Sequence, residues 1–391
     1  MFHKLLKLAL VPAALLCVGV IRLLARFGFL IRFGEIFSSR IGHMAGNMEC
    51  YLCEKEAGMQ KGFDIWTHRG RVCNKQLAKM LGRAMWIDPT RFLQIISVVN
   101  RCFEGWEKHA IETSQLDRDI HGHYGKQKPH LSFTAAEEGK GRDTLRAWGL
   151  PEGAKWVCLI VRDSAYLPGL GYHSYRDSDI RTYELAAKEL SERGYWVFRM
   201  GAKIKRPIDP FLVYPITKVI DYAFDGRRSD FMDLYLGAKC EFCISNGTGF
   251  DAIPAIFRRP ICFVNYAPLE YLNTWIPNSL AIWKHYEKDG KRMTLEEVYE
   301  SKAGQFMATP EFLSAGISLV DNTPEEIRDA VIEVADRLNY PVRFMGHAYI
   351  PERRQEMFWE KFPRSISPYN NQPLHGEIQL RIGSKFLEQY Q

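Results

Sequence analysis

The chain lacks the marks of a secreted, fibrous or repetitive protein. Its nine cysteines are odd in number and scattered over 391 residues, which fits a reducing compartment better than a disulfide framework. No repeat and no low-complexity tract interrupts it. Hydrophobic residues make up 46% and charged residues 25%, the composition of a folded globular protein long enough for two domains.

The net positive charge is small outside the N-terminal segment. The net charge is +6, and five positive charges precede the first acidic residue, Glu35. The rest of the chain therefore carries only about +1, too little for the basic face that a nucleic-acid-binding body needs. We expect no nucleic-acid partner. The five early cations are Lys4, Lys7, Arg22, Arg26 and Arg32.

Recognisable metal motifs are also missing. Cys50-x-x-Cys53 and Cys240-x-x-Cys243 suggest zinc, but no His/Cys partner pair has the spacing of a zinc site. The second pair lies on a predicted strand, where positions i and i+3 point to opposite faces. No Asp-x-Asp pair comes directly after a predicted strand. We therefore expect no metal site and no cofactor.

No apolar run is long enough to span a membrane. Leu8 to Ile21 is apolar for fourteen residues, whereas a spanning helix needs about twenty, and Arg22 and Arg26 stand where a signal peptide would have its cleavage site. Residues 1–33 predict an amphipathic helix in the plane of a membrane, peripheral on the inner face of the cytoplasmic membrane. The alternative is a helix packed on the first domain.

The alternation of strands and helices predicts two α/β units. Residues 34–145 predict a first Rossmann-like domain on the acceptor side, and residues 146–340 a second with a parallel, doubly wound sheet. Residues 341–391 are expected to form a helical extension that packs on the first domain. Predicted strands cover 62–66, 84–87, 156–162, 195–200, 218–222, 240–245 and 260–265; predicted helices cover 47–56, 74–81, 91–109, 180–193, 229–238, 251–257, 294–301 and 324–338.

Ligands of such sheets bind beyond the carboxyl ends of the strands, so the loops there hold the candidate residues. Arg162 and Arg199 each close a predicted strand, and an arginine fork suits a diphosphate. Small residues ahead of a helix leave backbone amides facing an anion. The predicted binding residues are Arg162, Arg176, Arg199, Gly201, Asp230, Ser245, Asn246, Gly247, Thr248 and Gly249.

Each of these residues has a structural alternative. Asn246 to Gly249 can be a turn with a helix cap, and Arg199 can pair with Asp221 or Asp230. The candidate catalytic residues are Arg162, Asp177, His43 and His173, the last three by residue type and loop position. Asp177 and Asp179 can instead cap the helix that starts at Ile180, and His173 can pack its loop.

Two long segments carry a resemblance to a known family. Tyr172 to Gly201 and Asp221 to Tyr266 resemble bacterial glycosyltransferases associated with surface-polysaccharide clusters. They are also remotely similar to the α-1,2- and α-1,6-fucosyltransferases. Leu159 to Arg162 matches a strand ending in His-x-Arg, with Ile160 at the histidine, and Asp230 to Thr248 matches a later helix–strand motif.

The resemblance implies a GT-B fold, two Rossmann-like domains with a cleft between them. It also implies a metal-independent enzyme that moves a sugar from a nucleotide-sugar donor to a glycan or lipid-linked acceptor, as in lipopolysaccharide synthesis. Arg162 would be the phosphate-binding arginine. Two alternatives stay open: another nucleotide-sugar enzyme, such as an epimerase, and a non-catalytic scaffold for glycan assembly.

Overall fold

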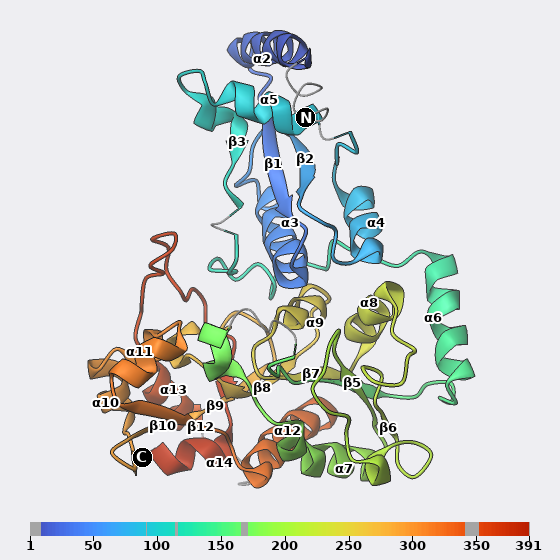
Figure 1. Ribbon diagram of the computed structural model, residues 1–391, viewed down its shortest axis with the longest axis vertical. Helices are drawn as coiled ribbons and strands as arrows, with labels where there is room; N and C mark the ends of the chain where they lie inside the picture. Colours follow the sequence, from blue (N-terminus) through green and yellow to red (C-terminus); the bar gives the residue numbers. More distant parts are fainter. Residues whose placement is uncertain (1–8, 91, 114–115, 166–170, 341–351, 391) are drawn as a thin grey trace.

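A computed structural model describes residues 9–90, 92–113, 116–165, 171–340 and 352–390. It contains two α/β units with parallel sheets, one above the other in Figure 1. This confirms the predicted two-unit α/β architecture of the GT-B type.

The first unit is built on a small parallel sheet of order β2-β1-β3. Its strands are β1 (Ile31–Phe37), β2 (Phe63–Arg69) and β3 (Ala110–Ile111). The Trp66 indole lies directly over Gly34, where a Cβ would stand 2.4 Å from the ring. The helices of this unit are α2 (Val11–Arg26), α3 (Met48–Glu56), α4 (Lys75–Ala84) and α5 (Phe92–Asn100), with a π-helical turn, η1 (His43–Asn47), ahead of α3.

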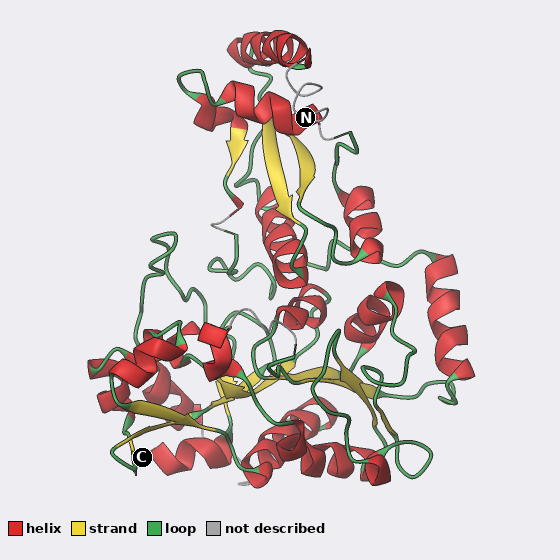
Figure 2. Ribbon diagram, viewed as in Figure 1, coloured by secondary structure: helices red, strands yellow, loops and turns green. Residues whose placement is uncertain are grey.

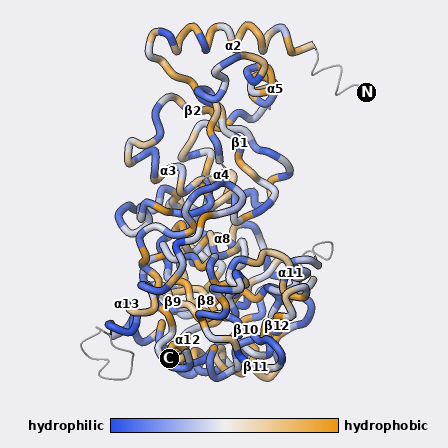
Figure 3. Tube along the Cα trace, turned by 90° about the vertical axis from the view of Figure 1, so that its left-hand side faces the viewer, coloured by the Kyte–Doolittle hydropathy of each residue, from blue (hydrophilic) through white to orange (hydrophobic). Residues whose placement is uncertain are grey.

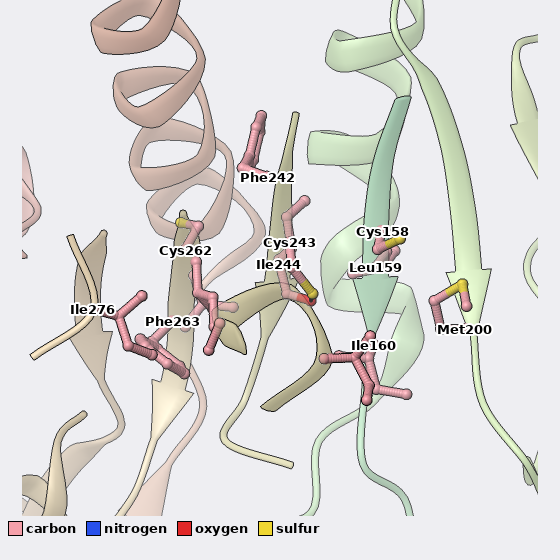
Figure 4. Packing of buried hydrophobic residues seen from close by; sticks show 14 of the residues in the cluster. Cys158, Leu159, Ile160, Met200, Phe242, Cys243, Ile244, Cys262, Phe263 and Ile276 are labelled. Atoms are coloured by element: carbon pink, nitrogen blue, oxygen red, sulfur yellow. Dashed lines mark hydrogen bonds between the residues drawn. The ribbon is translucent and has the colours of Figure 1, made fainter. Parts of the chain in front are cut away.

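The second unit is built on a seven-stranded sheet of order β13-β9-β8-β7-β4-β5-β6, and all its strand pairs are parallel. Helices cover both of its faces (Figure 2). Because both faces are buried, the central strands are continuous apolar runs rather than alternating ones, and their side chains pack densely (Figure 4). The strands are β4 (Trp156–Ile160), β5 (Trp196–Met200), β6 (Val219–Ile220), β7 (Phe242–Ser245), β8 (Ile261–Tyr266), β9 (Leu280–Trp283) and β13 (Arg381–Ile382).

The helices of the second unit divide between the two faces of this sheet. α7 (Glu184–Glu192) and α12 (Pro324–Asn339) pack against each other on one face, and α8 (Asp230–Lys239) and α9 (Ala252–Ile256) lie on the face toward the first unit (Figure 1). Ser229 caps α8, accepting a hydrogen bond from the Met232 amide. A small antiparallel sheet adds β10 (His285–Lys288), β11 (Lys291–Arg292) and β12 (Ile317–Val320), accompanied by α10 (Leu295–Glu300) and α11 (Thr309–Ser314).

Two parts of the sequence expectation differ from the structure. The strand predicted at residues 84–87 is only a single bridge between Trp66 and Ile87. The C-terminal segment was expected on the first unit, but β13 extends the second sheet beside β9, and α14 (Ser384–Leu387) packs on α12. α13 (Glu352–Lys361) precedes them. In this C-terminal segment, Glu377 forms an ion pair with Lys126, which lies in the stretch of chain between the two units.

The connector helix α6 (Ala135–Ala147) touches both units. Its Glu137, fixed by a capping box with Thr134, pairs with Arg83 of α4 in the first unit. On the other side, Gly141 lies against the ring of Tyr235 on α8, where a Cβ would stand 2.2 Å from the ring. The absence of a side chain at Gly141 thus sets how closely α6 approaches the second unit.

Two glycines of α6 give a stability prediction with an internal control. Gly141→Ala should lower the apparent melting temperature, because overpacking costs about 1–3 kcal/mol. Gly139→Ala should raise it slightly, because a Cβ there meets nothing within 4 Å and alanine favours a helix by roughly 0.5–1 kcal/mol over glycine. Calorimetric melting of both variants checks this, and equal shifts would contradict the packing described.

Candidate functional site

The strand order of the second sheet reverses between β4 and β7. In doubly wound sheets, the crevice outside the carboxyl ends of the strands at such a point is where ligands bind. Arg162 is the second residue after β4, and Asn246 is the first residue after β7. Two of the loops singled out from the sequence are therefore neighbours at this point.

Asn246 joins these two loops through its side-chain amide. Its Oδ1 accepts a hydrogen bond from the backbone amide of Arg162 at 2.9 Å, and its Nδ2 donates to the backbone carbonyl of Arg176 at 2.8 Å. Asn246 is fully buried. The two hydrogen bonds fix the backbone positions from which the side chains of both arginines extend.

Arg162 is held beside a carboxylate. Its Nε lies 3.2 Å from Oδ1 of Asp177, and its side chain is 15% exposed. Burial raises the pKa of Asp177, although the charge of Arg162 lowers it. A buried lysine, Lys284, donates to the Asp177 carbonyl at 2.6 Å and pairs with Asp321 at 2.7 Å.

A polar cavity of about 300 Å³ opens beside this pair. Carboxylates and cations share its wall: Asp163, Asp177, Asp179, Arg199, Lys205, Arg206 and Asp321. Asp179 is the N-cap of the 3₁₀ turn that starts at Ile180, as the capping alternative predicted for it. Asp177 makes the ion pair with Arg162 instead.

Arg176 points back at the loop after β7. It donates through Nη2 to the carbonyl oxygen of Gly247, and no carboxylate of the described residues forms an ion pair with it. Burial lowers the pKa of His173, and the charges of Arg176, Arg162 and Arg40 lower it further. The charges of three guanidinium groups, from both units, therefore lower the pKa of the His173 imidazole.

The first unit supplies the opposite wall of this site. The backbones of Gly42 and Gly249 touch, so that a Cβ on Gly42 would lie 3.0 Å from the Gly249 Cα. His43 begins the η1 turn there. Burial lowers the pKa of His43, its hydrogen bond to Asn47 raises it, and the charges of Arg40 and Asp117 act in opposite directions.

The loop after β7 is less open to an anion than its sequence suggests. Asp251 occupies it, accepting hydrogen bonds from the Thr248 amide at 2.7 Å and from the hydroxyls of Thr248 and Ser245. The Ser245 hydroxyl in turn accepts from the Gly247 amide at 3.1 Å. Neither side chain takes the Gly249 amide. The loop is thus a capped turn, as the structural alternative held, and its function is to shape the site more than to supply amides.

Three further predicted binding residues make structural contacts: Arg199, which also lines the cavity, Gly201 and Asp230. Arg199 is 1% exposed and pairs with Asp221 at 3.2 Å, which favours its structural alternative. Gly201 packs against Ile204 and Ala223. Asp230 holds the start of α4 in the first unit, because its Oδ2 accepts the Lys75 amide at 2.8 Å.

One group of side chains in the described part of the chain could hold a metal ion, namely Glu49, Cys53 and His130, whose ligand atoms lie within 4.8 Å of one another. The guanidinium of Arg258 bonds Glu49 at 2.7 Å and lies 3.6 Å from the Cys53 sulfur. A cation of the protein thus balances this carboxylate. Cys50, the other member of the predicted pair, points to the Tyr124 hydroxyl.

Sequence reasoning passed over Arg40, Asp251 and Lys284 as site residues. Arg40 stood in a loop assigned only to the cleft wall, and Asp251 was taken as an ordinary first-turn residue of a helix. Lys284 follows β9, a strand that was not predicted. A lysine that closes an apolar run, as in Leu280–Trp283 followed by Lys284, is the signal that was available.

No protein-family model matches the chain, and no curated protein sequence matches it. Among solved structures, a glycosyl transferase family 9 protein from Veillonella parvula has a TM-score of 0.44 at 12% identity, covering 79% of this chain and 97% of its own. ADP-heptose LPS heptosyltransferase II of E. coli has a TM-score of 0.44 at 12% identity, covering 79% and 98%.

An epimerase is also similar. UDP-GlcNAc 2-epimerase from Neisseria meningitidis bound to UDP-GlcNAc has a TM-score of 0.29 at 12% identity, covering 79% of this chain and 99% of its own. TM-scores this low decide neither the substrate nor the site residues of this chain, and the remote similarity to fucosyltransferases stays a prediction.

Asn246 gives the prediction for the site. Asn246→Ala should lower the apparent melting temperature, because it leaves the Arg162 amide and the Arg176 carbonyl without partners at about 1–3 kcal/mol each. Asn273→Ala, which removes only a 3.4 Å hydrogen bond from Tyr266, should change it less. An Asn246→Ala protein that melts like the wild type would show that the two loops do not depend on this amide.

Proposed function

We propose that the chain is a glycosyltransferase that moves a sugar from a nucleoside diphosphate sugar to a glycan or lipid-linked acceptor. One observation carries this proposal: Asn246 holds Arg162 and Arg176 together at the strand-order reversal of a doubly wound sheet, and the charge of Arg40, from the first unit, acts with theirs on the His173 imidazole. Guanidinium forks suit the oxygens of a diphosphate. A synthesis of bacterial surface polysaccharide, lipopolysaccharide included, is the process that the sequence resemblance favours.

In the proposed reaction, the bond between the sugar C1 and the diphosphate oxygen breaks as a bond from C1 to the acceptor oxygen forms. Negative charge develops on the leaving diphosphate, and Arg162 and Arg176 stabilise it from fixed positions. Arg40 adds a third positive charge from the first unit. These three cations can do the work for which other enzymes use a divalent ion, and the reaction is proposed to be metal-independent.

His43 is the best placed of the three candidate bases. Burial lowers the pKa of His43 and the charge of Arg40 lowers it further, while the hydrogen bond with Asn47 and the charge of Asp117 oppose this shift, so the imidazole is neutral and can accept a proton. His173 is acted on by three arginines, which disfavour its protonated form. Asp177 already pairs with Arg162. His43 also belongs to the first unit, the proposed acceptor side.

The polar cavity beside Arg162 is a natural place for another part of the donor. Carboxylates such as Asp163 accept hydrogen bonds from sugar hydroxyls. The cavity adjoins Asp177, the partner of Arg162, so a donor with its diphosphate on Arg162 reaches it without crossing the sheet.

Substitution of Arg162 tests the proposal directly. Arg162→Ala should lower kcat/KM by about 10²–10³-fold in a purified, folded enzyme offered a panel of nucleotide sugars, since it removes a preorganised positive charge. Arg181→Ala is the matched control, because Arg181 pairs with Asp179 on the surface, and it should leave activity near wild type.

The same panel, run without acceptor, separates the alternatives. Unchanged turnover in Arg162→Ala would contradict the phosphate role of this arginine. Donor converted in the absence of any acceptor would favour an epimerase, and no nucleotide binding in calorimetry would favour a scaffold.

The pH profile tests the assignment of the base. A catalytic His43 must be neutral, so kcat/KM should fall as pH drops through its pKa, which lies below the ordinary 6.5. His43→Gln should lower kcat strongly and abolish this acidic limb, whereas His173→Gln should keep the limb. An unaltered limb in His43→Gln would move the role to another group.

A further inference from the structure

Helix α2 is apolar on two opposite sides. On its inner side, Ala14 and Val18 are buried in a small core with Phe33, Leu93 and Ile96. On its outer side, large apolar residues face solvent: Leu15 is 45% exposed, Leu16 71%, Val20 49% and Leu23 53%. A helix that is apolar all round needs a second apolar partner.

The exposed apolar surface continues beyond the helix. Phe27, 81% exposed, and Phe29, 54% exposed, follow α2 in the turn before β1. Arg22 ties α2 to the end of α5, donating to Oδ1 of Asn100 and the carbonyl of Glu104, and its guanidinium lies over the Phe103 ring at 5.5 Å. Phe103 is itself 38% exposed. The helix is therefore held in place on the first unit with its outer side turned away.

We propose that the outer side of α2, with Phe27 and Phe29, docks on an anionic lipid bilayer with the helix parallel to the membrane plane. Figures 1 and 3 show α2 as the outermost element of the first unit, largely orange along its length in the hydropathy view. No helix in the described part of the chain is long and apolar enough to cross a membrane. An in-plane position satisfies both observations.

The charges near this surface favour a lipid rather than a protein partner. α2 contains no acidic residue, and Arg26, in its last turn, is exposed. Lys4 and Lys7 precede the helix in the sequence. A cation such as Arg26 beside an apolar strip is attracted to anionic headgroups, whereas two copies packed through this strip would bring like charges together.

The size of the strip also disfavours a second copy. A helix of 16 residues is about 24 Å long, and a strip about 10 Å wide along it covers roughly 240 Å². A stable protein interface needs about 800 Å² on each partner. A bilayer has no such threshold, because each apolar side chain that enters it contributes separately.

This packing changes how membrane binding should be tested. Removal of residues 1–33 would take away β1 residues and uncover Leu93, Ile96 and Val99, so a loss of solubility would be ambiguous. Substitutions on the outer side of α2 leave that core intact. The inference does not rest on the proposed enzymatic function.

The experiment is co-sedimentation of the full chain with phosphatidylcholine vesicles that contain or lack phosphatidylglycerol. Wild type should bind the anionic vesicles more tightly than the neutral ones. Leu16→Asp combined with Leu23→Asp should weaken this binding at least tenfold. Leu313→Asp is the matched control, because Leu313 is 72% exposed on α11 of the second unit, and it should bind like wild type.

Melting curves establish that the variants are folded. Wild-type protein that stays in the supernatant with both kinds of vesicle would overturn the proposal, as would binding of the double variant equal to wild type. Concentration-dependent dimerisation of wild type without vesicles, abolished in the double variant, would show that a second copy covers the strip and would also overturn it.

Discussion

The amide side chain of Asn246 is the constraint on which the proposed site depends. The strand order reverses between β4 and β7, so the loops after these strands diverge to opposite faces of the sheet. A buried group that bonds both loops keeps them together, and Asn246 does so with one acceptor and one donor. Each bond ends at the backbone of an arginine, so the amide sets the backbone positions from which two positively charged side chains extend.

Contacts between the two units complete the site from the other side. Gly42 and Gly249 touch through their backbones, and Arg258 of the second unit bonds Glu49 of α3. Asp230 holds the first turn of α4. These contacts bring Arg40 and His43 to the arginines of the second unit.

Much of the second sheet could be predicted from the sequence, because strands buried on both faces read as continuous apolar runs. β4, β5, β7 and β8 were found in this way. β9 and β13 were missed: the apolar run Leu280–Trp283 of β9 was passed over, and β13 has only two residues, at the edge of the sheet. The capped turn after β7 was an open alternative in the sequence, but its filling by Asp251 was missed, because that depends on side-chain hydrogen bonds that no spacing reveals.

The sequence pattern could not distinguish the roles of the two strand-end arginines. Both close an apolar run, but Arg199 pairs in register with Leu159, inside the sheet, and is buried against Asp221. Arg162 lies three residues beyond that level, in the loop. Register between strands separates a structural arginine from a candidate phosphate ligand, and register is a property of the folded sheet.

The proposed membrane-binding helix and the proposed site lie at opposite ends of β1 in the first sheet. α2 precedes β1, whereas Arg40 and His43 follow it. A strand of seven residues is about 23 Å long. An acceptor carried by the lipid surface proposed for α2 would have to extend over that distance to reach the cleft, which suits a long glycan better than a bare lipid headgroup.

A crystal structure with a nucleoside diphosphate tests the central claim most directly. The account predicts diphosphate oxygens within hydrogen-bond distance of the guanidinium groups of Arg162 and Arg176, at the carboxyl ends of β4 and β7. A diphosphate bound elsewhere, such as at the amino ends of β5 and β6 near Tyr195 and Lys218, would contradict it.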